Sequence, residues 1–128
     1  MDAETLDDLD PPAWGDANDD DTYLVRRCHE LRRKPLDEFA PEDLRIMIGQ
    51  QIALPFLVPR ALNLLAADPL VSGDLFPGDL LEAVMRIDDS YWTQHPGQLE
   101  GISNLVGTLV PVDGEVRAAV EAFRAKHG

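Results

Sequence analysis

Apolar residues recur at three- and four-residue spacings along most of the chain, and this period restricts the fold more than any other feature. The clearest run lies near the C-terminus, where the apolar positions are Val116, Ala119, Val120 and Phe123. Almost no stretch shows the strict alternation that is typical of a half-buried strand. With 128 residues and 45% apolar content there is room for one core. The sequence therefore predicts an all-α fold, a single compact bundle of about six helices.

Prolines and short polar residues predict where these helices begin and end. Pro41 suits the first position of a helix. Asp79 is expected to cap the helix that begins at about residue 80. A short helical turn is expected through Tyr91 and Trp92. The six expected helices cover about residues 20–34, 41–52, 55–67, 80–87, 97–109 and 113–126.

Acidic residues are concentrated at the N-terminal end. The formal net charge is −13, and residues 1–21 hold nine acidic residues and no Lys or Arg, whereas residues 22–128 hold fifteen against eleven basic ones. Phosphates repel such a chain, so we expect no direct nucleic-acid binding and a basic protein partner instead. The segment also carries Leu6, Leu9 and Trp14. We expect residues 1–21 to dock partly through these three side chains on a helical domain formed by residues 22–128.

Nothing in the sequence predicts a membrane span or a secretory signal. The longest strictly apolar stretch, residues 52–59, has eight residues, against the ~20 that cross a bilayer. The chain opens on acidic residues, where a secretory signal has basic ones. One cysteine cannot form an internal disulfide, which fits a reducing compartment. We expect a cytoplasmic protein without membrane contact, and we favour a monomer.

The run Cys28-His29-Glu30 places a nucleophile beside a base in the sequence. Consecutive helical residues point about 100° apart, so these side chains do not face one another. Cys28 shares a predicted core stripe with Leu24 and Leu31, and a buried structural thiol is favoured over a reactive one.

No pattern in the sequence favours a metal, a cofactor or catalysis. The three histidines lie far apart, and the glycines form no phosphate-binding loop. Asp79 with Glu82, or Glu42 with Asp43, could act as an acid and base pair. First-turn carboxylates also stabilise helix N-termini, and we favour that structural role over a small hydrolase. The basic run 26–34 could contact phosphates, but internal pairing with the acidic segment is favoured.

The segment Asp88-Asp89-Ser90-Tyr91-Trp92 combines two acids with two aromatic rings. Protein interfaces use both, the acids for steering and the rings as rigid anchors. The alternative is that one or both rings are half-buried in the core.

Five stretches, with Leu6, Leu9 and Trp14-Gly15, carry a resemblance to a known family. They are Tyr23-Leu-Val, Cys28-His-Glu-Leu-Arg-Arg-Lys-Pro-Leu, Glu42-Asp-Leu-Arg-Ile-Met-Ile-Gly-Gln, Leu57-Val-Pro-Arg-Ala-Leu and Gly73-Asp-Leu-Phe-Pro-Gly-Asp-Leu-Leu-Glu-Ala-Val. In their order and spacing the chain resembles the immunity proteins of bacterial contact-dependent growth inhibition systems, over about residues 4–98. It departs from them at Ala53, where a glycine is usual, at an added Pro55, and at Arg60, where an aliphatic residue is common.

The resemblance implies a cytoplasmic, non-enzymatic protein that binds and blocks the C-terminal toxin domain delivered by a neighbouring cell. Such toxins are often nucleases, whose basic substrate sites an acidic inhibitor can occupy. The alternative is a helical adaptor or regulatory module that binds a cellular protein through the edge from Asp88 to Trp92. The residues expected to contact the partner are Asp19, Asp20, Asp21, Asp74, Asp79, Glu82, Asp88, Asp89, Tyr91 and Trp92.

Overall fold

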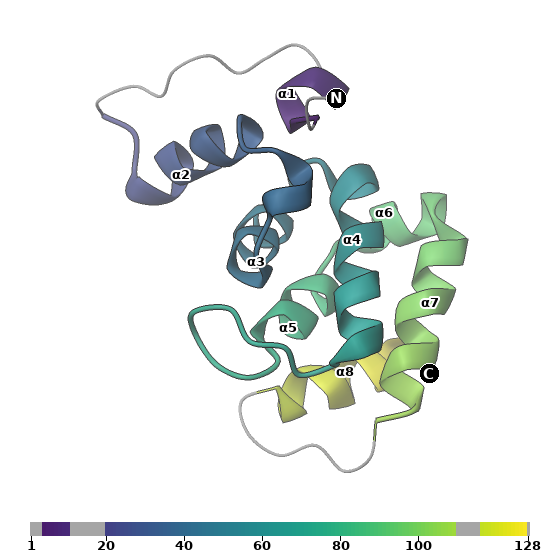
Figure 1. The fold of residues 1–128 in the computed structure, drawn as a ribbon. Helices are drawn as coiled ribbons and strands as arrows, with labels where there is room; N and C mark the ends of the chain where they lie inside the picture. The colour runs from purple at the N-terminus through teal and green to yellow at the C-terminus, as the bar shows by residue number, and fades with distance from the viewer. Residues whose placement is uncertain (1–3, 11–19, 110–115, 128) are drawn as a thin grey trace.

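The computed structural model describes residues 4–10, 20–109 and 116–127, and the regular elements of these residues are helices (Figure 1). The all-α prediction is therefore confirmed for the described part of the chain. Its elements are α1 (Leu6–Leu9), α2 (Tyr23–Arg32), the 3-10 turn η1 (Leu36–Glu38), α3 (Pro41–Gly49), α4 (Leu54–Ala67), α5 (Asp79–Met85), α6 (Asp89–Gln94), α7 (Pro96–Gly107) and α8 (Arg117–His127).

Local sequence signals fix several helix starts. The Thr22 side chain accepts a hydrogen bond from the Val25 backbone N–H at 3.2 Å and so caps α2. Pro41 occupies the first turn of α3, as expected, because its missing N–H would have no partner there. The Asp43 carboxylate reaches back to the Ala40 N–H at 3.0 Å. These starts agree with the sequence to within a few residues.

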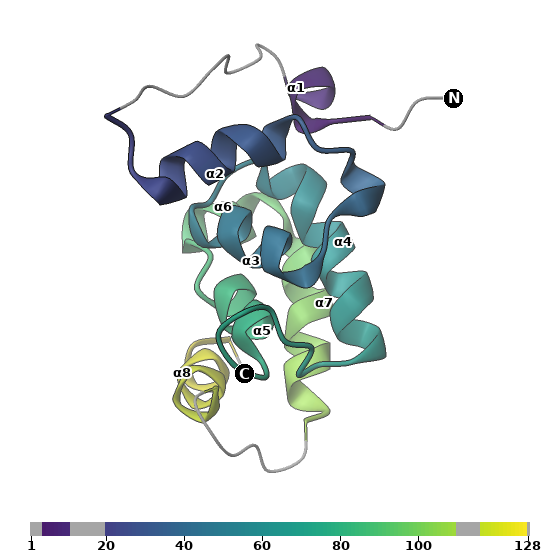
Figure 2. The same ribbon diagram turned by 60° about the vertical axis from the view of Figure 1, so that its left-hand side comes forward.

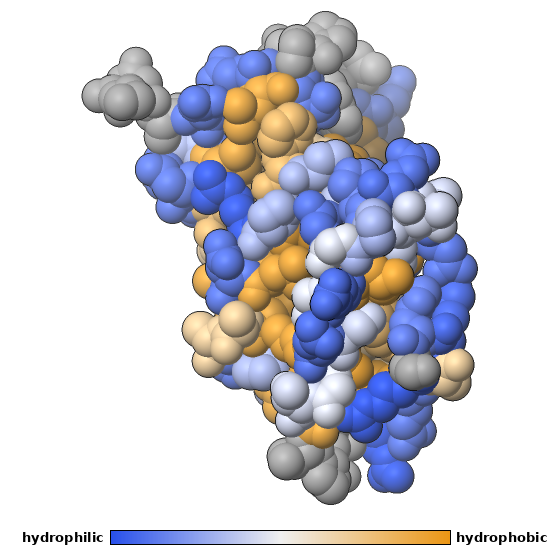
Figure 3. Space-filling view, turned by 90° about the vertical axis from the view of Figure 1, so that its right-hand side faces the viewer, coloured by the Kyte–Doolittle hydropathy of each residue, from blue (hydrophilic) through white to orange (hydrophobic). Residues whose placement is uncertain are grey.

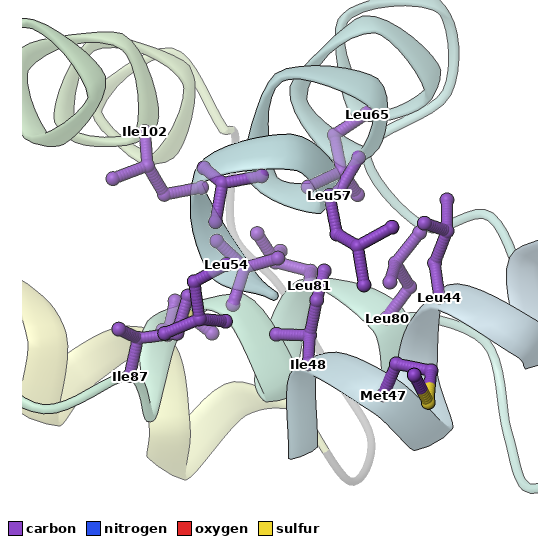
Figure 4. Close-up of a cluster of buried hydrophobic side chains, with 14 of the residues drawn as sticks. Leu44, Met47, Ile48, Leu54, Leu57, Leu65, Leu80, Leu81, Ile87 and Ile102 are labelled. Atoms are coloured by element: carbon purple, nitrogen blue, oxygen red, sulfur yellow. The ribbon is translucent and has the colours of Figure 1, made fainter. Parts of the chain in front are cut away.

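The hydrophobic core lies between α3, α4 and α5, with α7 on the far side of α4 and α8 against α5 (Figures 1 and 2). Figure 4 shows Leu44 and Ile48 of α3 pointing toward Leu57 of α4 and Leu81 of α5. All four are buried, and a fully buried leucine contributes about 1.5–3 kcal/mol. This packing makes α3 and α5 neighbours, although 29 residues separate their ends.

Two local expectations are wrong. Leu24 is 37% exposed instead of lying in the core, because the first turn of α2 extends beyond α3 (Figures 1 and 2). Asp79 does not cap its helix; it is the first residue of α5, and Gly78, with φ of 92°, precedes it. The Asp79 carboxylate binds a loop instead.

The short helix α1 packs on the body of the protein. Leu6 is fully buried and Leu9 is partly buried against the core. The Arg32 side chain pairs with Asp7 at 2.9 Å and with Asp10 at 3.2 Å. The prediction that the basic run pairs internally is thereby confirmed at Arg32. Trp14 lies outside the described residues. Among the described helices none is long and apolar enough to cross a membrane.

Candidate interaction surface

A cleft of about 240 Å³ opens between α3 and α5, beside the loop that joins α4 to α5. The loop is the open segment next to α5 in Figure 1. We call this feature the α3–α5 cleft. Its lining residues are Arg45, Ile48, Gly49, Gln51, Leu75, Phe76, Asp79, Glu82, Ala83 and Arg86.

The buried carboxylate of Asp79 organises this loop. Its Oδ1 accepts the Gly73 N–H at 2.6 Å, and its Oδ2 accepts the Leu75 N–H at 3.0 Å. Asp79 is 3% exposed, so the expectation that it lies on an exposed edge is wrong. Buried charge is costly unless it is paired and hydrogen-bonded, and these backbone donors supply the bonds. Asp79 therefore holds the loop and presents little surface of its own.

Glu42 of α3 holds the same loop from the other side. Its Oε1 accepts the Asp74 N–H at 2.9 Å, and Arg45 donates two hydrogen bonds to the Glu42 carboxylate, both at 2.6 Å. The hydrogen bond from Arg45 is the main cause that lowers the pKa of Glu42, against the opposing effect of burial. The Arg45 Nε also lies 3.8 Å from Asp79 Oδ2. One guanidinium thus compensates both loop-holding carboxylates.

Glycine is required at position 73 by this close approach. A Cβ on Gly73 would lie 2.5 Å from Oε1 of Glu42 and 3.2 Å from its Cα. An antiparallel bridge between Ser72 and Pro77 closes the loop. The loop is consequently fixed by bonds at both ends and at its centre.

Three carboxylates lie at or beside the cleft, and one of them, Glu82, is half-buried. Asp74 is exposed at the loop, and Asp88 is exposed where α6 begins, with its N–H donating to Oε1 of Gln51 at 3.0 Å. Glu82 lines the cleft from α5 and pairs at 2.8 Å with Arg86, an exposed side chain that also lines it. We call Asp74, Glu82 and Asp88 the acidic rim. Three of the expected contact residues thereby lie at the cleft or next to residues that line it.

The α6 segment is only partly a surface. Asp89 is exposed and lies 2.7 Å from Nζ of Lys126. Tyr91 is half-buried, and its hydroxyl donates to Oε1 of Gln98. Trp92 is 2% exposed and belongs to the core, because it lies on the buried face of the helical turn. Of the two interpretations of Trp92, an interface anchor or a ring in the core, the structure confirms the ring in the core.

The N-terminal acids lie elsewhere, before α2. Asp19 falls outside the described residues, whereas Asp20 is exposed and Asp21 is half-buried. They lead into the exposed first turn of α2, where Tyr23 is 76% exposed. Neither Tyr23 nor Leu75, which is 62% exposed, is among the residues expected to contact the partner. The turn residues Gly73 and Pro77-Gly78 around Leu75 were the available signal, since apolar residues at a loop tip have no core to enter.

The groups considered for catalysis have structural surroundings. Cys28 is 2% exposed, and burial raises the pKa of its thiol, which confirms the buried structural thiol. The Asp43 carboxylate bonds to Lys34 at 2.6 Å and to Arg27 at 3.2 Å. Within the described residues no group of three or more His, Cys, Asp or Glu could hold a metal ion.

A second depression of about 430 Å³ lies between α4 and α7. Figure 3 shows the side of the molecule on which α7 lies, with apolar patches between hydrophilic side chains. The residues that line the depression between α4 and α7 carry no charge, and Leu62, Leu65 and Leu105 are among them. It therefore offers a basic partner no complementary charge, unlike the acidic rim.

Comparison with known proteins gives one family. A family model described as CDI immunity proteins matches residues 8–102, which confirms the resemblance noted over residues 4–98. The matched span contains the whole α3–α5 cleft and its acidic rim, whereas α8 lies beyond it. No curated protein matches the chain.

Proposed function

The chain belongs to the CDI immunity proteins, a family that neutralises toxins and is not a family of enzymes, and we propose that it blocks the basic active site of a cognate nuclease toxin. The protein acts by stoichiometric binding to the C-terminal toxin domain of a contact-dependent growth inhibition effector. It needs no catalytic residue, metal or cofactor for this, and it acts in the cytoplasm of the cell that it protects.

The observation that carries the proposal is the acidic rim beside the α3–α5 cleft. A nuclease binds phosphates through Lys and Arg, so its substrate site is basic. Asp74 and Asp88 are exposed next to residues that line the cleft, and Glu82 lines it. Such a surface complements a basic site, speeds the encounter and disfavours other partners. Occupying the site excludes the nucleic acid sterically and by charge.

The N-terminal acids extend the proposal. Asp19, Asp20 and Asp21 form a second acidic stretch before α2, which can widen the contact to the size of a stable interface, about 1,200–2,000 Å² in total. The buried Asp79 carboxylate accepts hydrogen bonds from the loop backbone, and the Trp92 ring of α6 is buried in the core. Neither of these two side chains touches the toxin in the proposed complex.

The adaptor alternative loses its main support. It depends on aromatic anchors between Asp88 and Trp92, but Trp92 is buried and Tyr91 is half-buried with its hydroxyl bonded to Gln98. An interface anchor has to present its ring to the partner. We therefore propose the toxin as the partner and not another cellular protein.

Titration of the toxin's nuclease activity tests the proposal. Increasing amounts of the protein are added to the cognate toxin domain with nucleic acid present, and activity should fall linearly to zero at one protein per toxin. The double variant Asp74→Asn, Asp88→Asn should need a clear excess. The control Glu100→Gln, Glu121→Gln removes the same charge from exposed sites on α7 and α8 and should behave as the unmodified protein. Undiminished activity at a large excess of the protein would exclude the proposed function.

A further inference from the structure

We infer that Leu75, held out by the loop of residues 72–76, is the apolar anchor that enters a pocket on the toxin domain. The inference rests on the proposed function and adds to it the residue that dominates the contact. Among the large apolar side chains of the described residues, Leu75 is 62% exposed and only Tyr23, at 76%, is more exposed; Leu24, Leu70 and Val25 are 37%, 38% and 39% exposed. A partner that buried this side chain would gain the free energy of removing it from water.

The loop is rigid before any partner arrives. The backbone N–H groups of Gly73 and Leu75 bond to Asp79, and that of Asp74 bonds to Glu42. The bridge between Ser72 and Pro77 closes the base of the loop. Ordering a loop on binding costs free energy, and a loop that is already ordered avoids that cost. Leu75 is therefore presented in a fixed position.

The surroundings of Leu75 have the composition of an interface hot spot. Asp74 is exposed next to it, and Glu82 stands across the cleft. The small residues Gly49 and Ala83 line the floor of the cleft and leave room for a side chain of the partner. A side chain that a partner buries completely near the centre of an interface can carry a large share of the binding energy. The exposed carboxylate of Asp74, next to Leu75, favours a basic surface on the partner, as proposed for the toxin domain.

Affinity for the cognate toxin domain tests the anchor directly. Leu75→Ala should weaken binding by about 30-fold or more, as for a hot spot, whereas Leu75→Met, which keeps an apolar side chain of similar size, should stay within about threefold of the unmodified protein. Leu70→Ala is the matched control, since it removes the same side chain from a position that is also exposed but does not line the cleft. It should leave the dissociation constant unchanged. Thermal unfolding should be the same for all of these variants, because both positions are exposed.

A change in the loop tests its rigidity without touching Leu75. Gly73→Ala brings a Cβ against Glu42 and should raise the dissociation constant, with faster hydrogen exchange at the Leu75 amide. Gly97→Ala, where nothing lies within 4 Å of the added Cβ, is the control and should change neither.

The outcomes separate the two proposals. If the unmodified protein binds tightly and Leu75→Ala binds equally well, the anchor is wrong and the proposed function stands. If the unmodified protein does not bind a folded cognate toxin domain, both are wrong.

Discussion

The Nε of Arg32 lies 2.9 Å from Oδ1 of Asp7, so that a buried ion pair joins α1 to the last turn of α2. The guanidinium also donates to the backbone oxygen of Asp10 at 2.6 Å. The Arg32 side chain is 1% exposed, and burial of a charge is tolerated when it is paired and hydrogen-bonded in this way. Part of the N-terminal acidity therefore serves the fold. The acids left for a partner are those at the surface.

Removal of Arg32 should destabilise the protein strongly. In Arg32→Gln the Asp7 carboxylate, 14% exposed, loses its guanidinium partner, and the free energy of unfolding should fall by about 3 kcal/mol. Arg26→Gln is the control on the same helix, at an exposed position, and should stay within about 0.5 kcal/mol. Urea denaturation measures both. Equal stability of the two variants would show that the buried ion pair does not hold α1 in place.

Stability should fall in acid because two carboxylates of α3 have lowered pKa values. Hydrogen bonds from Arg45 lower the pKa of Glu42. Burial alone would raise the pKa of Asp43, but Lys34, the Ala40 N–H and Arg27 together lower it. A lowered folded-state pKa adds stability that is complete above the ordinary values, 4.5 for Glu and 3.8 for Asp, and is lost as the pH falls through the lowered ones.

The measurement is the melting temperature as a function of pH. Between neutral pH and pH values below the ordinary carboxylate range, the drop should be smaller in Glu42→Gln than in the unmodified protein, because one titrating group with a lowered pKa is gone. Glu100→Gln changes an exposed carboxylate on α7 and should retain the full drop. Parallel curves for Glu42→Gln and the unmodified protein would refute this assignment.

Ala53 adopts a backbone conformation that suits glycine, with φ of 53° and ψ of 36° just before α4. This is the position at which the family resemblance leads one to expect a glycine. The left-handed region costs a residue with a Cβ about 1–2 kcal/mol, which a glycine would not pay. Glycine also has more conformational freedom in the unfolded chain, and this offsets part of the stability that the substitution gains. Ala53→Gly should therefore raise the free energy of unfolding by about 0.5 kcal/mol. Ala66→Gly, inside α4, should lower it by about 1 kcal/mol, and a loss in both variants would contradict the strain at Ala53.

The sequence predicted those parts of the fold that local signals determine. The apolar period defines the helices, and Thr22 and Pro41 mark starts that the structure retains. The prediction that Leu24 is buried was wrong, because the period shows which face of a helix is apolar but not how far the neighbouring helix extends along that face. Trp92 could not be decided by composition, since an aromatic ring beside two acids is typical of an interface and also of a core boundary.

The candidate site was harder to predict, because it depends on contacts between distant residues. Asp79 fits the local rule for a helix cap, but its carboxylate instead accepts hydrogen bonds from the backbone N–H groups of residues 73 and 75. Glu42 reaches the same loop across 32 residues. No spacing in the sequence reveals this meeting of α3 and α5. Once the loop is held there, the exposure of Leu75 follows from it.

The measurement that tests the central claim most directly is the association rate of the protein with its cognate toxin domain at two salt concentrations. Between about 0.01 M and about 1 M salt the screening length falls from about 30 Å to about 3 Å. The account predicts a tight 1:1 complex whose association rate falls by about tenfold or more over this range, because the acidic rim steers the encounter with a basic site. An association rate indifferent to salt, or no complex with a folded toxin domain, would contradict it.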